Sequence, residues 1–156
     1  MTQRQPRRDD LLTSFEVASQ PGNERVVLAR VADAVAGLGL DGRQTRRLET
    51  AVAEAAMNAI EHGNREAATV PVEVEVFRSD GGVVVAITDQ GGGGPSPADL
   101  PEPDLDLKLA GEQTPRGWGL FLIRHMVDSL WVTDHGPRHT VWLEMEVSPA
   151  SGAERP

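Results

Sequence analysis

Three short segments of the sequence place polar side chains and glycines at spacings that could perform chemistry. The first runs from Glu54 to Gly63 and reads Glu-Ala-Ala-Met-Asn-Ala-Ile-Glu-His-Gly. Residues four apart project from the same side of a helix, so Glu54, Asn58 and His62 would form one polar stripe. An ordinary solvated helix face shows the same pattern. Asparagine is a mediocre helix former, however, and its position among alanines suggests a role other than helicity.

The second segment follows a hydrophobic run at residues 83–88 and reads Asp89-Gln-Gly91-Gly-Gly93-Gly94. Four consecutive glycines carry a large entropic cost and favour no particular fold. They suit a backbone that must approach a ligand closely. A flexible loop after a strand is the alternative interpretation, and an isolated Asp-x-Gly-x-Gly pattern does not separate the two.

The third segment is Arg116-Gly117-Trp118-Gly119, directly before an apolar helical pattern. A helix N-terminus presents free N–H groups and the positive end of its dipole, which together bind phosphate. Arg116 would add a cation for a distal phosphate. Glycine also precedes many helices for purely conformational reasons, so this segment gains meaning only beside the other two.

The elements around these segments follow from the spacing of the apolar residues. Three helices are predicted at about 23–37, 41–63 and 117–130, with Asp41 as an N-cap and Gly63 as a stop. Strands are predicted at 12–17, 70–77, 83–88, 131–133 and 140–147, with a hairpin turn at 79–82 and another connection at 134–138. This order favours an α+β fold, a two-layer sandwich with helices on one face of a mixed or antiparallel sheet.

Length and composition bound the function. The 156 residues suffice for one domain, which we expect at 11–147 between polar tails at 1–10 and 148–156 that we expect to be disordered. The chain has no cysteine, no apolar leader and no run of about 20 apolar residues, so we expect a cytoplasmic protein with no membrane span. The net charge of −9 argues against direct binding of nucleic acid.

Taken in order, the three segments resemble the histidine-kinase-like ATPase superfamily of gyrases, chaperones, kinases and mismatch-repair proteins (GHKL). Glu54-x-x-x-Asn58 is similar to its N box, and Asp89-x-Gly91-x-Gly93 to its first glycine box. Arg116-Gly117-x-Gly119 is similar to its second glycine box, and His139-Thr140-Val141 to its closing segment. The resemblance covers about residues 12–147 and implies the Bergerat-type ATP-binding fold.

The resemblance also implies a role for each matching residue toward ATP and Mg²⁺. Asn58 would hold the Mg²⁺ ion, Asp89 would accept a hydrogen bond from the adenine amine, and Glu54 would be the general base. Gly91 and Gly93 would let the loop pass close to the nucleotide, while Arg116, Gly117 and Gly119 would face the phosphates. Thr140 would support Asp89 or a water beside the base, and the segment 89–116 would be the ATP lid.

Two features depart from the family pattern. Trp118 is unusually large for the second glycine box, and the lid segment is rich in proline, at Pro95, Pro97, Pro101, Pro103 and Pro115. His62 is expected to be a polar residue near a helix end, without a catalytic role.

The short chain and the sequence around Asn58 resemble anti-sigma factor serine/threonine kinases in particular. That likeness implies a homodimer that phosphorylates an anti-anti-sigma (STAS-type) partner or binds a sigma factor, with partner contacts near Glu24, Arg25 and Arg30 on the first helix. The alternative is a non-catalytic module that switches a partner through ATP-dependent conformation. A sensor histidine kinase is disfavoured because no histidine precedes the second helix. Gyrase-like and chaperone-like enzymes need additional domains.

Overall fold

A computed structural model describes residues 5–91 and 115–147, with side chains of the second range described from residue 121. Its sheet has five strands in the order β1-β2-β3-β5-β4, and every neighbouring pair is antiparallel. The strands are β1 (Leu11–Ala18), β2 (Pro71–Ser79), β3 (Gly82–Asp89), β4 (Ser129–His135) and β5 (Arg138–Glu146). The expected α+β class is confirmed, and the sheet is antiparallel rather than mixed.

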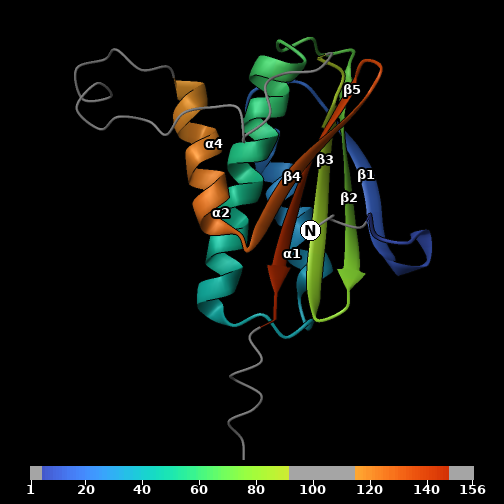
Figure 1. Ribbon diagram of the computed structural model, residues 1–156. Helices are drawn as coiled ribbons and strands as arrows, with labels where there is room; N and C mark the ends of the chain where they lie inside the picture. The colour runs from blue at the N-terminus through green and yellow to red at the C-terminus, as the bar shows by residue number, and fades with distance from the viewer. Residues whose placement is uncertain (1–4, 92–114, 148–156) are drawn as a thin grey trace, which may run out of the picture.

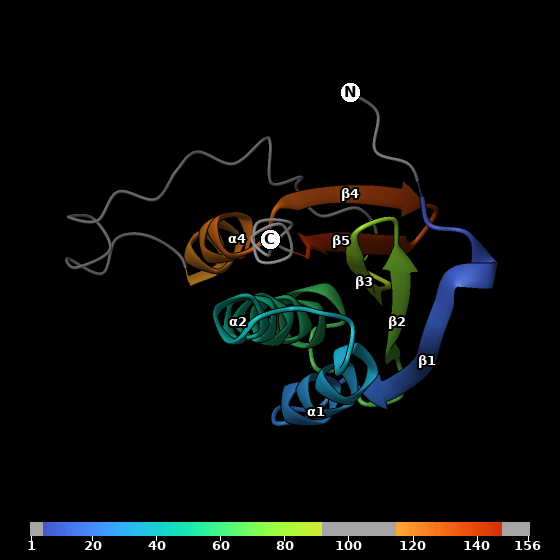
Figure 2. The same cartoon turned by 90° about the horizontal axis from the view of Figure 1, so that it is seen from below.

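Three helices cover one face of this sheet, as Figures 1 and 2 show. They are α1 (Glu24–Val35), α2 (Gly42–Asn58) and α4 (Pro115–Met126). The middle helix, α2, contacts both of the others and the strands beneath it. The expected two-layer sandwich is therefore present. No helix in the described ranges combines the length and apolarity that crossing a bilayer requires.

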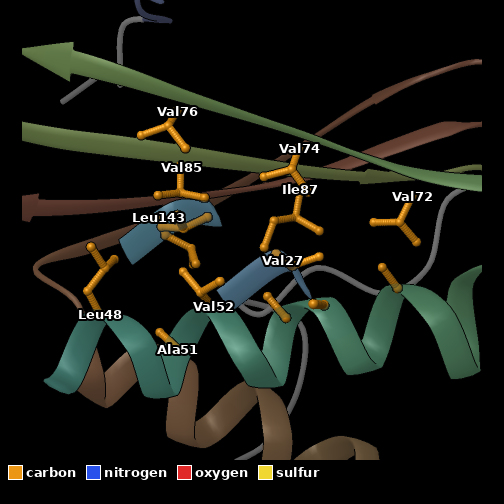
Figure 3. Close-up of a cluster of buried hydrophobic side chains, with 14 of the residues drawn as sticks. Val27, Leu48, Ala51, Val52, Val72, Val74, Val76, Val85, Ile87 and Leu143 are labelled. Carbon is orange, nitrogen blue, oxygen red and sulfur yellow. The ribbon is translucent and has the colours of Figure 1, made fainter. Parts of the chain in front are cut away.

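The core between the layers is aliphatic because successive strand residues point to opposite faces. Val85 and Ile87 of β3 meet Val52 of α2 on the helical side (Figure 3). On the other face, Ala86 packs with Phe77 and Trp142. Every residue of β3 is buried, which explains why its sequence is a continuous apolar run rather than an alternating one.

Helix α2 begins as the sequence predicts and ends differently. The Asp41 side chain accepts a hydrogen bond from the Gln44 backbone, and the Gln44 side chain accepts one from the Asp41 backbone, which makes a complete capping box. The regular α-helix ends at Asn58, and Ala59–Gly63 form a single π-helical turn. Gly63 is thus the end of the helical segment, but a wider turn precedes it.

Other boundaries shift by a few residues because strand pairing overrides local pattern. Residues 129 and 130, expected in the third helix, belong to β4, where Leu130 lies opposite Leu143. The strands of this hairpin extend to His135 and Arg138, so the connection is shorter than expected. Ordered structure also precedes residue 11, since Arg8–Asp10 form a 3-10 turn and Arg8 pairs with Glu75.

Candidate functional site

The candidate site lies where β3 ends, with Asp89 as its most buried carboxylate. Asp89 is the last residue of β3 and is only 6% exposed. By strand alternation it points to the helical side, as Val85 and Ile87 do. Its Oδ1 accepts a hydrogen bond from the Gly91 backbone at 2.7 Å. A carboxylate can accept about four such bonds.

Two glycines enclose the Asp89 carboxylate. A Cβ added to Gly63 would overlap the carboxylate, and a Cβ added to Gly91 would overlap the Gly63 backbone and Asp89 Oδ1. The π-helical turn thus lies directly against the loop that follows β3. Gly91 thus lies close to Gly63 and Asp89, and its predicted place beside a nucleotide stays a prediction. Gly93 lies outside the described residues.

The stripe on α2 that carries Glu54 and Asn58 faces toward α4. Arg47, seven residues before Glu54 on the same side of the helix, donates a hydrogen bond to the His125 carbonyl of α4 at 3.1 Å. The two helices run antiparallel side by side (Figure 1). Because each rises about 1.5 Å per residue, Asn58 lies at about the level of Pro115, where α4 begins. The antiparallel packing of α2 and α4 therefore brings the first segment close to the start of the third.

The environment of Glu54 favours its neutral form. Burial, and secondly the Glu61 carboxylate, raise the pKa of Glu54 above its ordinary value. A carboxylate with a raised pKa is a better proton acceptor, as a general base requires. Four residues on, the Asn58 Nδ2 atom is buried and has no hydrogen-bond partner among the described residues. A buried N–H donor that is left unsatisfied costs free energy, so this position suits a hydrogen-bond acceptor.

The third segment begins the helix rather than preceding it. Helix α4 starts at Pro115, so Arg116 and Gly117 belong to its first turn and Gly119 is its fifth residue. The first four residues of a helix have no intrahelical partner for their N–H groups, which places the Gly117 N–H among the free donors. In a regular helix the Gly119 N–H reaches the Pro115 carbonyl instead. The side chains of 115–120 lie outside the described set.

The structure places Thr140 differently from the expectation. Its hydroxyl lies 2.7 Å from the Thr88 hydroxyl, and both residues point away from the helices. The β5 residue opposite Asp89 is His139, which is 7% exposed. Its Nδ1 lies 2.7 Å from Asp134 Oδ1 on β4. His139, not Thr140, therefore shares the face of the sheet that carries Asp89.

Sequence reasoning also missed Asn64, which is 6% exposed and follows Gly63 directly. Its side chain hydrogen-bonds the Gln90 backbone, next to Asp89. The only local signal was a polar residue after the predicted helix stop, which is common in exposed turns. His62, expected to have no catalytic role, is exposed.

The described residues fit a nucleotide better than a protein-only metal centre. They contain no group of three or more His, Cys, Asp or Glu side chains arranged to hold a metal ion. Asn58, Asp89 and the start of α4 are the groups for which the sequence predicts contacts with Mg²⁺, adenine and phosphate, and these roles stay predictions.

Comparisons with known proteins point the same way. The model of a family described as histidine kinase-like ATPase domain matches residues 17–145, most of the chain. A search of curated proteins gives no significant match.

Three solved structures share the fold. The RsbU and RsbW domains of Rv1364c from Mycobacterium tuberculosis give a TM-score of 0.59 at 18% identity, over 86% of this chain and 32% of that one. The SiaB–SiaC complex from Pseudomonas aeruginosa gives 0.59 at 13% identity, over 88% and 91%. A blue-light activated histidine kinase, EL346 from Erythrobacter litoralis, gives 0.55 at 20% identity, over 81% and 42%. The chain thus spans about a third of the first protein's length and less than half of the third's.

Proposed function

The chain belongs to the histidine kinase-like ATPase domain family, and we propose that it is an ATP-dependent protein serine/threonine kinase that acts as an anti-sigma factor. Its substrate would be a serine of an anti-anti-sigma (STAS-type) partner in a bacterial partner-switching pathway. The protein would work in the cytoplasm as a homodimer, with α1 near the partner surface.

ATP binding uses three groups of residues at one end of the sandwich. Asp89 accepts a hydrogen bond from the adenine amine, and the first turn of α4, with Arg116 and Gly117, binds the phosphates. Asn58 provides an amide oxygen for Mg²⁺, which when bound neutralises phosphate charge. Its buried Nδ2, which has no partner among the described residues, could donate to a phosphate oxygen of the same nucleotide.

The single observation that carries the kinase assignment is the position of Glu54, a half-buried carboxylate four residues before Asn58 on the same helix stripe; burial also raises the pKa of Glu54. Glu54 would take the proton of the partner's serine hydroxyl. The serine oxygen then forms a bond to the γ-phosphorus, the bond from that phosphorus to the β–γ bridging oxygen breaks, and ADP leaves. A phosphate placed in the interface adds about two negative charges and would release the partner.

The names of the structural neighbours support a partner-switching role. One neighbour comprises RsbU and RsbW domains, and another was solved as SiaB together with SiaC. Each resembles this chain at below 25% identity, so the likeness in fold supports the proposal without identifying a partner.

The proposal is tested first by nucleotide binding. Titration with a fluorescent ATP analogue and Mg²⁺ should give saturable binding, and Asp89→Asn should weaken it by about tenfold to a hundredfold. Wild-type protein that binds no ATP would refute the proposal as a whole.

Phosphotransfer is tested with a STAS-type domain from the same genome as acceptor. Glu54→Gln should reduce phosphoserine formation by about a hundredfold or more while ATP affinity stays within about twofold. Glu49→Gln, a change of the same kind on the same helix but off the stripe, is the matched control and should retain activity.

Undiminished phosphorylation by Glu54→Gln would contradict the role of that residue. ATP binding without phosphotransfer to any STAS-type domain would instead favour a non-catalytic module that switches its partner through nucleotide-dependent conformation.

A further inference from the structure

A buried asparagine outside the expected motifs joins three parts of the chain at the site. The Asn64 Nδ2 donates to Ser19 Oγ at 2.9 Å and to the Pro71 carbonyl at 3.1 Å, with the Val70 carbonyl further away at 3.4 Å. Its Oδ1 accepts a hydrogen bond from the Gln90 backbone at 2.8 Å. One side chain therefore links the end of β1, the start of β2 and the residue after Asp89.

The backbone around Asn64 is held in uncommon conformations. Asn64 itself has φ −94° and ψ 0°, a sparsely populated region in which many active-site residues lie. Arg65 and Glu66 follow with φ of 53° and 58°, which residues other than glycine seldom adopt. Such conformations persist where the surrounding contacts enforce them. The π-helical turn contributes, since the Asn64 N–H bonds to the Ala59 carbonyl at 2.8 Å.

Gly63 and Asn64 together contact Asp89, the last residue of β3, and the two residues that follow it. Gly63 lies against the Asp89 carboxylate and the Gly91 backbone, while Asn64 binds the intervening Gln90. Gly91 in turn donates to Asp89 Oδ1. The orientation of the carboxylate thus depends on residues on both sides of it, and the Asn64–Gln90 bond is one side-chain contribution.

We propose that Asn64 is a positioning residue that sets the direction of the Asp89 carboxylate and thereby the selectivity for a 6-aminopurine. This inference rests on the proposed ATP-binding function. Asn64 itself does not touch the nucleotide. Its effect reaches the base through Gln90 and Asp89.

The test compares the affinities for ATP and for ITP, which carries an oxygen in place of the 6-amino group. Asn64→Ala should reduce the preference for ATP over ITP by about tenfold, because the carboxylate loses its fixed direction. Ser19→Ala is the matched control. It removes the Ser19 hydroxyl from the same buried cluster but keeps the Asn64–Gln90 bond, so it should lower the thermal midpoint without changing the ATP/ITP ratio.

A structural role alone would lower both affinities equally, or change the ratio equally in both variants, and either result would overturn the inference. If Asn64→Ala does not fold, hydrogen exchange of the wild-type protein tests the Asn64–Gln90 hydrogen bond instead. The Gln90 amide should be protected, and rapid exchange of that amide would refute the role of this bond. Wild-type protein that binds no ATP, or binds ATP and ITP equally, would refute the proposed function or the role of Asp89. An unchanged ratio in a folded Asn64→Ala variant would refute this inference alone.

Discussion

The two ends of the sheet are built from different kinds of residue. The site end, at the top of Figure 1, is where β3 finishes, and the far end, at the bottom, is where the hairpin joins β2 to β3. All buried polar side chains found in the described ranges lie at the site end: Ser19, Asn64, Thr88, Asp89, His139 and Thr140. Toward the far end the buried residues are hydrophobic, among them Leu48, Val83 and Met145.

The difference in polarity suggests that the far end contributes mainly to stability and the site end mainly to nucleotide recognition. A buried polar group without complete partners costs free energy, whereas buried aliphatic area supplies most of the free energy of folding. The far end is also stabilised by a contact between α2 and β5, because the Gln44 side chain of the capping box donates a hydrogen bond to the Glu146 carbonyl at 2.6 Å. Changes at the far end should therefore reduce stability, and changes at the site end should reduce nucleotide recognition.

The largest expected effect on stability is at Leu48, which is 1% exposed and packs in the core. Leu48→Ala should lower the free energy of unfolding by about 2–5 kcal/mol, through lost burial and the cavity that remains. Chemical denaturation measures this change. ATP affinity measured well below the midpoint should match that of the wild type, and a parallel loss of affinity would contradict the separation of the two ends.

Two glycine-to-alanine changes compare the ends directly. At Gly63 the added methyl group would overlap the Asp89 carboxylate, so Gly63→Ala should weaken ATP binding by about tenfold or more, and its loss of stability should be the smaller of the two because a side chain rather than backbone must shift. At Gly82 it would meet the Met145 backbone, so Gly82→Ala should lower stability by about 1–3 kcal/mol and leave ATP binding unchanged. Calorimetric titration and thermal denaturation of both variants give the comparison. If the two variants lost ATP affinity and stability to the same extent, the two ends of the sheet would not differ in function as proposed.

A smaller effect is expected from the capping box at the start of α2. Asp41→Ala removes the acceptor for the Gln44 backbone and should lower the free energy of unfolding by about 1 kcal/mol. Urea denaturation should show this loss, and ATP affinity should not change. Asp33→Ala on α1, whose side chain has no hydrogen bond or ion pair with the described residues, serves as the control for removal of one negative charge.

The smallest expected effect is the response of Glu54 to pH. Because its pKa is raised in the folded protein, Glu54 disfavours folding once it is ionised, and the penalty grows as pH rises through the folded pKa. Glu54→Gln should therefore stabilise the protein at pH 8 by on the order of 0.5 kcal/mol, allowing for partial solvent screening. At a pH below the ordinary glutamate range the gain should vanish. A variant less stable than wild type at pH 8 would show that the Glu54 carboxylate is favourably paired.

Much of this architecture is contained in the sequence. The helices, the strands, the Asp41 cap and the α+β sandwich follow from apolar spacing and turn residues, which act over a few positions. Asp89 at the end of a buried strand and the Glu54–Asn58 stripe were likewise predicted from local pattern. The roles assigned to these residues remain predictions.

Only the tertiary structure decided how these pieces meet. A shift of one residue reverses the face of a strand residue, so the pairing of β3 with β5 determined that His139 and not Thr140 shares the Asp89 face. The raised pKa of Glu54 depends on its burial and on the position of Glu61. Asn64 binds partners 26 and 45 residues away, at Gln90 and Ser19, and no local pattern encodes contacts over such separations. The sequence specified which residues could recognise a nucleotide, and the packing of the π-helical turn against the end of β3 determined how they are held.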